Sequence, residues 1–174
     1  MLLHRSTPSM TAAVVAVVAV VLTACGGTAA PEADQLDVAT MDEYGCGYGF
    51  WLASPDQRVA VRLAAAPEIA ATGGLPAEVT LPDEAWDGTV LIGEDLYANW
   101  CDDVIEPGEA EPDVAEQWPV TAGTITLLRS DPAAECPTDV RGRVSGLEAT
   151  RPDGSVVELG ARDVVNDTWG CVAG

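Results

Sequence analysis

The feature that most constrains the fold is an apolar pattern that repeats every second residue. The stretches RVAVRLA (58–64), AEVTLP (77–82) and GTITLLR (123–129) all show it. Such alternation is typical of strands that bury one face. Turn-forming residues interrupt the chain roughly every ten residues. The chain is therefore predicted to be all-β, an antiparallel β-sandwich or barrel of about six to eight strands, immunoglobulin-like in architecture only.

The first 24 residues are organised as an export signal. A short basic start at His4 and Arg5 precedes AAVVAVVAVVL, residues 12–22, which is uncharged and almost purely aliphatic. This run is shorter than the about 20 residues that a transmembrane helix needs, and it suits the core of a signal peptide. Residues 1–24 are therefore predicted to be a signal peptide. An uncleaved membrane anchor and an ordinary secretory signal are the alternatives.

The signal ends in LTAC, residues 22–25, where an aliphatic residue and two small residues precede a cysteine. This motif resembles the lipobox of bacterial lipoproteins, and the resemblance covers only the signal and the first mature residue. It implies cleavage between Ala24 and Cys25 and a diacylglyceryl thioether on Cys25. Two acyl chains would then hold the protein to the extracytoplasmic face of the cell membrane. The absence of lysine, with abundant Ala, Gly, Arg and Pro, is typical of a GC-rich genome and favours an actinobacterial envelope.

Behind Cys25 the chain is small, polar and poor in large apolar side chains as far as Met41. Such a segment buries too little surface to offset the entropy lost on ordering it. Residues 25–41 are therefore predicted to be the acylated cysteine and a flexible tether. Residues 42–174 are predicted to form a single β-rich domain.

Four cysteines remain once Cys25 is assigned to the lipid, and outside the cytoplasm we expect them to form disulfides. With Asp153 and Gly154 as the two turn residues of a hairpin, residues 136 and 171 face each other across it. This geometry favours the pairing Cys136–Cys171 and leaves Cys46–Cys101, although the other two pairings stay open. The cysteines show no C-x-x-C spacing and the mature chain has no histidine, which argues against a zinc or redox site.

Acidic residues dominate the charge, with 28 Asp and Glu against 8 basic residues and a formal net charge of −20. Nucleic acid and anionic lipid headgroups are therefore unsuitable partners. The acids concentrate in segment 102–116, which we interpret as a solvated connection between strands. Because calcium takes carboxylate ligands from irregular loops, calcium binding is the alternative. The acidic residues of the segment are Asp102, Asp103, Glu106, Glu109, Glu111, Asp113 and Glu116, and the candidate calcium ligands are Asp102, Asp103 and Glu106.

The mature chain lacks the residues that usually transfer protons. The only histidine of the sequence, His4, lies in the predicted signal peptide, and the sequence contains no lysine. This excludes catalytic triads with histidine, Cys-His pairs and Ser-Lys dyads in the mature chain. Only a carboxylate pair, as in glycoside hydrolysis, remains as an enzymatic alternative. The sequence therefore predicts no catalytic residues and no cofactor, and a binding domain whose partner is an envelope protein or a glycan. The candidate ligand-binding residues are Trp51, Trp100 and Trp118.

Overall fold

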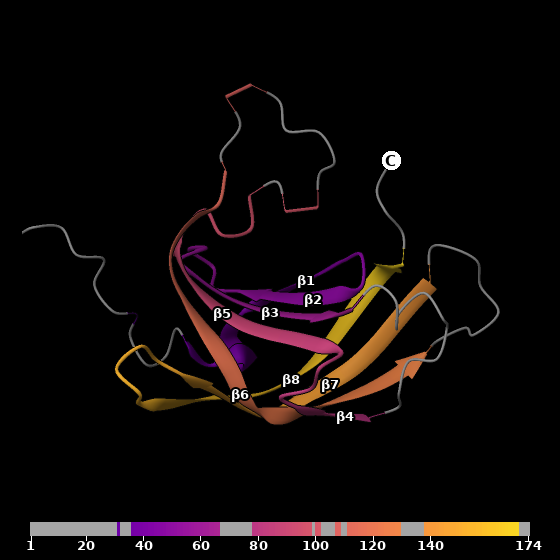
Figure 1. The fold of residues 1–174 in the computed structure, drawn as a ribbon. Coiled ribbons are helices and arrows are strands. Elements are labelled where there is room, and N and C mark those ends of the chain that lie inside the picture. Colours follow the sequence, from indigo (N-terminus) through magenta and orange to yellow (C-terminus); the bar gives the residue numbers. More distant parts are fainter. Residues whose placement is uncertain are drawn as a thin grey trace, which may run out of the picture.

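The computed structural model describes residues 31, 36–66, 78–98, 100–101, 107–108, 111–129 and 138–170. These residues form eight antiparallel strands and a short 3-10 helix (Figure 1), which confirms the predicted all-β fold. The strands are β1 (Asp42–Cys46), β2 (Gly49–Ala53), β3 (Val59–Ala65), β4 (Glu78–Leu81), β5 (Trp86–Glu94), β6 (Asp113–Arg129), β7 (Thr138–Thr150) and β8 (Val156–Trp169), and the helix is η2 (Val38–Thr40). None of the described residues belongs to a helix with the length and apolar character that a membrane span requires.

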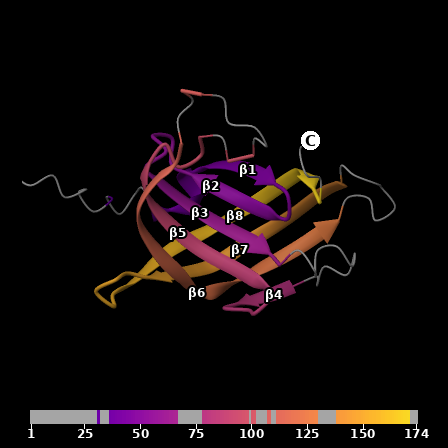
Figure 2. The ribbon, with the colours of Figure 1, turned by 45° about the horizontal axis from the view of Figure 1, so that its top comes forward.

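The sheet curls into a nearly closed barrel, seen from two directions in Figures 1 and 2. Its strand order, β1-β2-β3-β5-β6-β7-β8, follows the chain, and β4 pairs with β6 outside this path. The 17-residue strand β6 joins the two halves, because its first part pairs with β5 and its second part with β4 and β7. Of the two predicted forms, the structure is thus the barrel and not the immunoglobulin-like sandwich.

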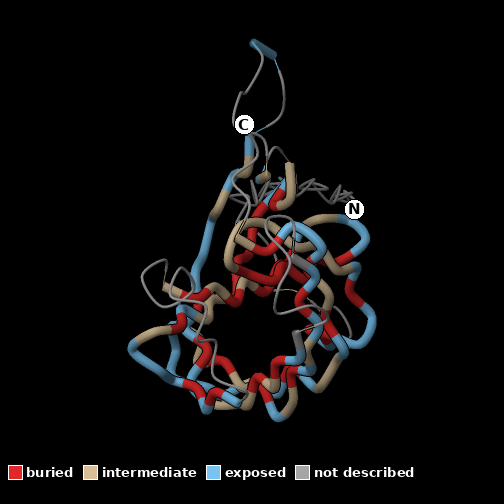
Figure 3. The backbone as a smooth tube through the Cα atoms, turned by 90° about the vertical axis from the view of Figure 1, so that its right-hand side faces the viewer, coloured by how far each residue is buried: buried red, intermediate tan, exposed pale blue. Residues whose placement is uncertain are grey.

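Alternating residues fill the barrel interior, as the sequence pattern predicted. On β3, the side chains of Val59, Val61 and Leu63 are completely buried, whereas Arg62 between them is partly exposed. Figure 3 shows buried and exposed residues alternating along the strands around the barrel. Burial of the aliphatic side chains on one face of every strand supplies the main stabilising term for such a fold.

The folded domain begins earlier than predicted. Leu36, Val38 and Met41 are at most 1% exposed and pack into the barrel core. Arg162 of β8 donates hydrogen bonds to the carbonyl groups of Val38 and Ala39, both at 3.2 Å. The predicted tether over residues 25–41 is therefore wrong at its end. The segment is polar overall, so its sequence did not predict that three apolar side chains are buried. They are buried only because the distant strands pack around them.

Side-chain hydrogen bonds hold the hairpin of β1 and β2 against β8, where the barrel nearly closes. The amide of Asn166, which is 1% exposed, donates to the carbonyl oxygens of Gly47 and Gly49 at 3.3 and 2.7 Å. The hydroxyl of Thr168 donates to the carbonyl of Gly45 at 3.3 Å. A Cβ at position 45 would lie 2.5 Å from Asn166, so glycine permits this close approach.

The β7–β8 hairpin has a wider turn than predicted. Thr150 pairs with Val156, which leaves residues 151–155 as the connection instead of Asp153 and Gly154 alone. Within the connection, Asp153 accepts hydrogen bonds from the backbone N–H and the hydroxyl of Ser155, which lower the pKa of its carboxyl. The turn chemistry was predicted correctly, but its length was not.

Two glycine bulges adjust the register along this hairpin. Gly146 and Gly160 adopt φ angles of +59° and +82° next to the register shifts. At the far end Thr138 pairs with Trp169. In the sequence, Cys136 and Cys171 lie two residues beyond this pair, outside the described residues, so their disulfide stays a prediction.

Candidate ligand-binding site

A second hydrophobic cluster lies on the outer face of the barrel wall. Because successive side chains of a strand point to opposite faces, Trp51 and Ala53 lie outside while Phe50 and Leu52 of the same strand point into the barrel. The segment that follows β5, residues 95–101, contributes Leu96, which is completely buried here. Every residue of β2 is consequently buried. The buried members of this outer cluster are Trp51, Ala53, Ala60, Leu91 and Leu96.

Two stacked aromatic pairs attach segment 95–101 to the strands. The rings of Tyr44 on β1 and Tyr97 stack with centroids 3.6 Å apart. The rings of Trp51 on β2 and Trp100 stack with centroids 4.0 Å apart and an interplanar angle of 27°. Each pair joins one ring from a strand to one from the segment, so together they fix the position and the orientation of Trp100.

Cys101 reaches β1 beside these aromatic pairs. Its sulfur lies 3.9 Å from the carbonyl oxygen of Gly45 and close to disulfide distance from Cys46. Of the two predicted disulfides, this is the one whose cysteines are described, and the fold brings them together. The oxidised bond itself stays a prediction.

Tyr97 is the group with the most perturbed protonation in this region. Burial, followed by the neighbouring Cys101, raises the pKa of its phenol above the ordinary value of 10.0. The phenol oxygen lies 4.0 Å from the sulfur of Cys101. Tyr97 is therefore a neutral packing group at physiological pH, and nothing in its surroundings prepares it to give up a proton.

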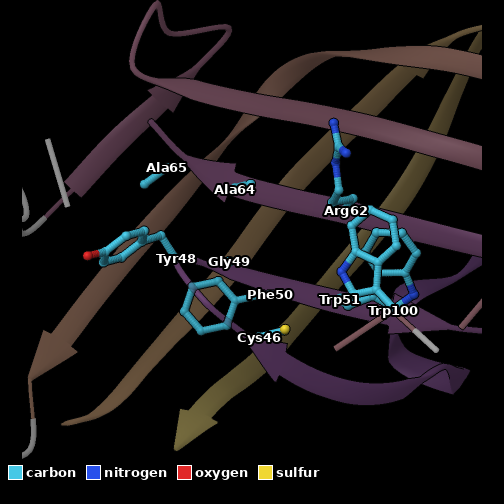
Figure 4. A pocket seen from close by; sticks show the side chains of 9 residues that line it. All are labelled: Cys46, Tyr48, Gly49, Phe50, Trp51, Arg62, Ala64, Ala65 and Trp100. Atoms are coloured by element: carbon cyan, nitrogen blue, oxygen red, sulfur yellow. The ribbon is translucent and has the colours of Figure 1, made fainter. Parts of the chain in front are cut away.

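A shallow trough crosses the outer face of four strands next to Trp100. The strand register places Cys46, Gly49, Ala64 and Asp87 in one row across β1, β2, β3 and β5. Gly49 and Ala64 give this row a low floor, because they carry at most a methyl group. The trough belongs to a pocket of about 210 Å³ (Figure 4). The lining residues of the pocket are Cys46, Tyr48, Gly49, Phe50, Trp51, Arg62, Ala64, Ala65 and Trp100.

The polar groups of the pocket gather at one side of the trough. Arg62 forms an ion pair with Asp87, and its guanidinium carbon lies 5.7 Å from the centroid of the Trp100 ring. Among the described residues, Nε1 of Trp51 and Nε of Arg62 are buried and have no hydrogen-bond acceptor. Both atoms are shielded from solvent and so lie out of reach of a ligand in the pocket. Trp100 is 38% exposed and presents its indole to solvent.

The structure brings together two of the three predicted tryptophans. Trp118 does not join Trp51 and Trp100, because it lies in the barrel core with 2% of its surface exposed. Its indole N–H donates to Glu116 at 2.9 Å, and the guanidinium of Arg151 lies 5.2 Å from its ring. The prediction of one ligand-binding face for these three residues is therefore wrong for Trp118.

Sequence reasoning missed Arg62, Asp87 and the small floor residues. Alternation had placed Arg62 on the polar face of its strand, opposite Leu63. No local signal indicated that Gly49, Ala64 and Asp87 lie in one row, since this row depends on the pairing of strands that are far apart in the sequence.

The other predicted sites lie outside the described residues. This applies to the lipidation site Cys25 and to the candidate calcium ligands Asp102, Asp103 and Glu106. Within the described part of the chain, no three His, Cys, Asp or Glu side chains are grouped so that they could hold a metal ion. Lipidation and calcium binding both stay predictions.

Comparison with known proteins adds no relative. The chain matches no protein-family model, no curated protein and no solved structure. Its function must therefore be inferred from its own residues.

Proposed function

We propose that this protein is a lipid-anchored lipoprotein of the cell envelope that binds its ligand in the pocket beside Trp100 and catalyses no reaction. One observation carries the proposal. Trp100 stays 38% exposed while it stacks on the buried Trp51 at the edge of an apolar pocket. Tryptophans held rigidly at the surface are typical of binding sites, because a large contact area is gained with little loss of entropy.

The composition of the pocket supports binding in preference to catalysis. None of its nine lining residues, all in the described part of the chain, is Asp, Glu, His or Lys. Asp87, the ion-pair partner of Arg62, is a single carboxylate, whereas glycoside hydrolysis requires two that flank the scissile bond. Cys46 and Tyr48 are the nucleophilic side chains in the lining, and Cys46 lies close to Cys101 as a disulfide partner would.

The proposed location rests on the resemblance to a lipobox at residues 22–25 and on the cysteine content. A diacylglyceryl group on Cys25 would supply the two acyl chains that stable anchoring needs. The remaining cysteines suit an oxidising compartment. The folded domain begins by Leu36, so the lipid would lie close in sequence to the barrel. The partner is then an envelope protein or a glycan within reach of the membrane surface.

The location is tested by intact-mass analysis of the membrane fraction. The wild type should have lost residues 1–24 and gained the mass of a diacylglyceryl group on Cys25. The Cys25→Ala variant should keep its signal peptide or leave the membrane fraction. An unlipidated wild-type protein would contradict the anchoring half of the proposal.

The binding half is tested with the purified lipoprotein in detergent and an isolated cell-envelope fraction. We expect Trp100→Ala to lower the apparent affinity by at least about tenfold, because it removes the exposed ring. Leu128→Ala is the matched control, since Leu128 is 67% exposed on β6 and does not line the pocket. Equal binding of both variants would contradict a ligand site at Trp100.

A further inference from the structure

The size of the pocket limits what it can hold. Its volume of about 210 Å³ lies below the roughly 300 Å³ at which pockets for drug-sized molecules begin. A Cβ at Gly49 would approach the carbonyl oxygen of Leu63 to 2.9 Å, so this floor position has little room for a side chain. The pocket therefore suits a single ring, with the rest of a longer ligand running along the trough.

The pocket presents a flat apolar surface next to polar groups. These match the face and the rim of a ring-shaped ligand. Trp100 supplies a flat apolar surface that is open to solvent. Arg62 supplies guanidinium N–H donors, and its side chain is 33% exposed. Asp87 supplies carboxylate oxygens next to the guanidinium. A pyranose ring has an apolar C–H face for the indole and a rim of hydroxyl groups that accept from the donors and donate to the carboxylate.

Charge and hydrogen bonding disfavour other ring-sized ligands. An anionic ligand would meet Arg62 already neutralised by Asp87, on a chain with a formal net charge of −20. A cationic ligand would lie beside the guanidinium. A purely apolar side chain of a peptide would cover the partly exposed Arg62–Asp87 ion pair without offering it a hydrogen-bond partner, which is costly.

We infer that the ligand is a neutral glycan, of which one pyranose ring stacks on Trp100 beside the Gly49–Ala64 floor. This inference rests on the proposed binding function and adds the chemical class of the ligand. Arg62 donates to oxygens of the bound sugar, and Asp87 accepts from its hydroxyl groups. The acidic surface does not oppose such a ligand, because a neutral sugar carries no charge to be repelled.

The first test is a glycan array that contains neutral, uronic-acid-containing and sulfated oligosaccharides, probed with the purified lipoprotein in detergent. Binding should concentrate on neutral oligosaccharides. The strongest of these is then titrated by isothermal calorimetry with the wild type and variants. Preferential binding to the anionic glycans, or binding to no glycan on the array, would overturn the inference.

Variants locate the binding. Trp100→Ala should weaken the affinity by about tenfold or more, and Trp100→Phe should restore part of it because the ring is kept. Ala64→Leu fills the trough from an outward-facing position and should weaken binding as strongly, without removing any polar group. Leu128→Ala should bind like the wild type. A variant is compared only if its melting temperature equals that of the wild type. Undiminished binding by both Trp100→Ala and Ala64→Leu would overturn the inference.

A second measurement separates this inference from the proposed function. The envelope fraction is oxidised with periodate, which cleaves the vicinal diols of sugars, and is then offered to the wild type and to Trp100→Ala. Loss of binding after oxidation supports the glycan. Binding that survives oxidation but still depends on Trp100 overturns the glycan and keeps the binding function. Binding that depends on neither overturns both.

Discussion

The two hydrophobic clusters of this domain differ in how they are enclosed. The interior cluster is largely aliphatic and is surrounded by hydrogen-bonded strands, with side chains such as Leu63 completely buried. The outer cluster has five buried residues, and segment 95–101 covers it through Leu96, Tyr97 and Trp100. The interior therefore determines the fold, whereas the outer cluster positions one exposed ring beside a pocket.

The largest expected effect compares one leucine from each cluster. Leu63 and Leu96 are both fully buried. Leu63→Ala should lower the free energy of unfolding by about 2–5 kcal/mol, because the strands around it cannot collapse into the cavity. Leu96→Ala should cost less, because a single covering segment relaxes more easily. Urea unfolding measures both, with Leu128→Ala as the exposed control, expected within about 0.5 kcal/mol of the wild type. A larger loss for Leu96→Ala would reverse the comparison.

The next effect concerns the cross-link that we predict between the outer cluster and the barrel. If Cys46 and Cys101 form a disulfide, the double variant Cys46→Ala/Cys101→Ala should lose about 2–4 kcal/mol of unfolding free energy. Peptide mass mapping without reductant should recover the two cysteines in one linked species. Alkylation of both thiols in the untreated protein would show that aromatic stacking alone holds segment 95–101.

A smaller effect follows from the raised pKa of Tyr97. The folded state holds the phenolic proton more tightly than the unfolded chain, whose tyrosine titrates near 10.0. Stability is therefore unaffected below that pH and falls as the pH rises from about 10 through the folded pKa. Tyr97→Phe removes this contribution, so its unfolding free energy should depend less steeply on alkaline pH. Identical pH profiles for the variant and the wild type would contradict burial as the cause.

The smallest effect is expected from calcium. The predicted solvated connection over 102–116 is wrong at its end, because Asp113 and Glu116 lie in β6. For the acids before β6 we keep this interpretation, so the melting temperature should be the same in millimolar calcium and in EDTA. The calcium alternative instead requires a clear rise with calcium, because a ligand that binds only the folded state stabilises it. A rise that Asp102→Asn/Asp103→Asn abolishes would assign the site to these carboxylates.

Sequence periodicity was informative for the interior because one rule governs every strand. A side chain that alternates with polar neighbours in a strand must face either the core or the solvent, so Val59, Val61 and Leu63 could be assigned locally. The rule failed before β1, where Leu36, Val38 and Met41 are spaced among polar residues outside any strand. Their burial depends on contacts with the barrel, which no local window contains.

For the candidate site, the sequence supplied the residue types but not their grouping. Trp51, Trp100 and Trp118 were equivalent as candidates, yet Trp118 faces the barrel core and the other two stack outside it. The hairpin shows the same limit, since its turn is wider than its Pro-Asp-Gly motif indicated and bulges shift its register. Such one-residue differences decide which side chains face each other.

By itself, the sequence determined that this protein is all-β and carries an acidic charge, because alternation and composition are local properties of the chain. The tertiary structure alone decided that the sheet nearly closes into a barrel, that Cys46 meets Cys101, and that Trp100 lies beside a row of small residues. The reason is physical: strand pairing joins residues that are tens of positions apart. The register aligns a glycine and an alanine next to an ion pair, and the exposed ring lies beside them.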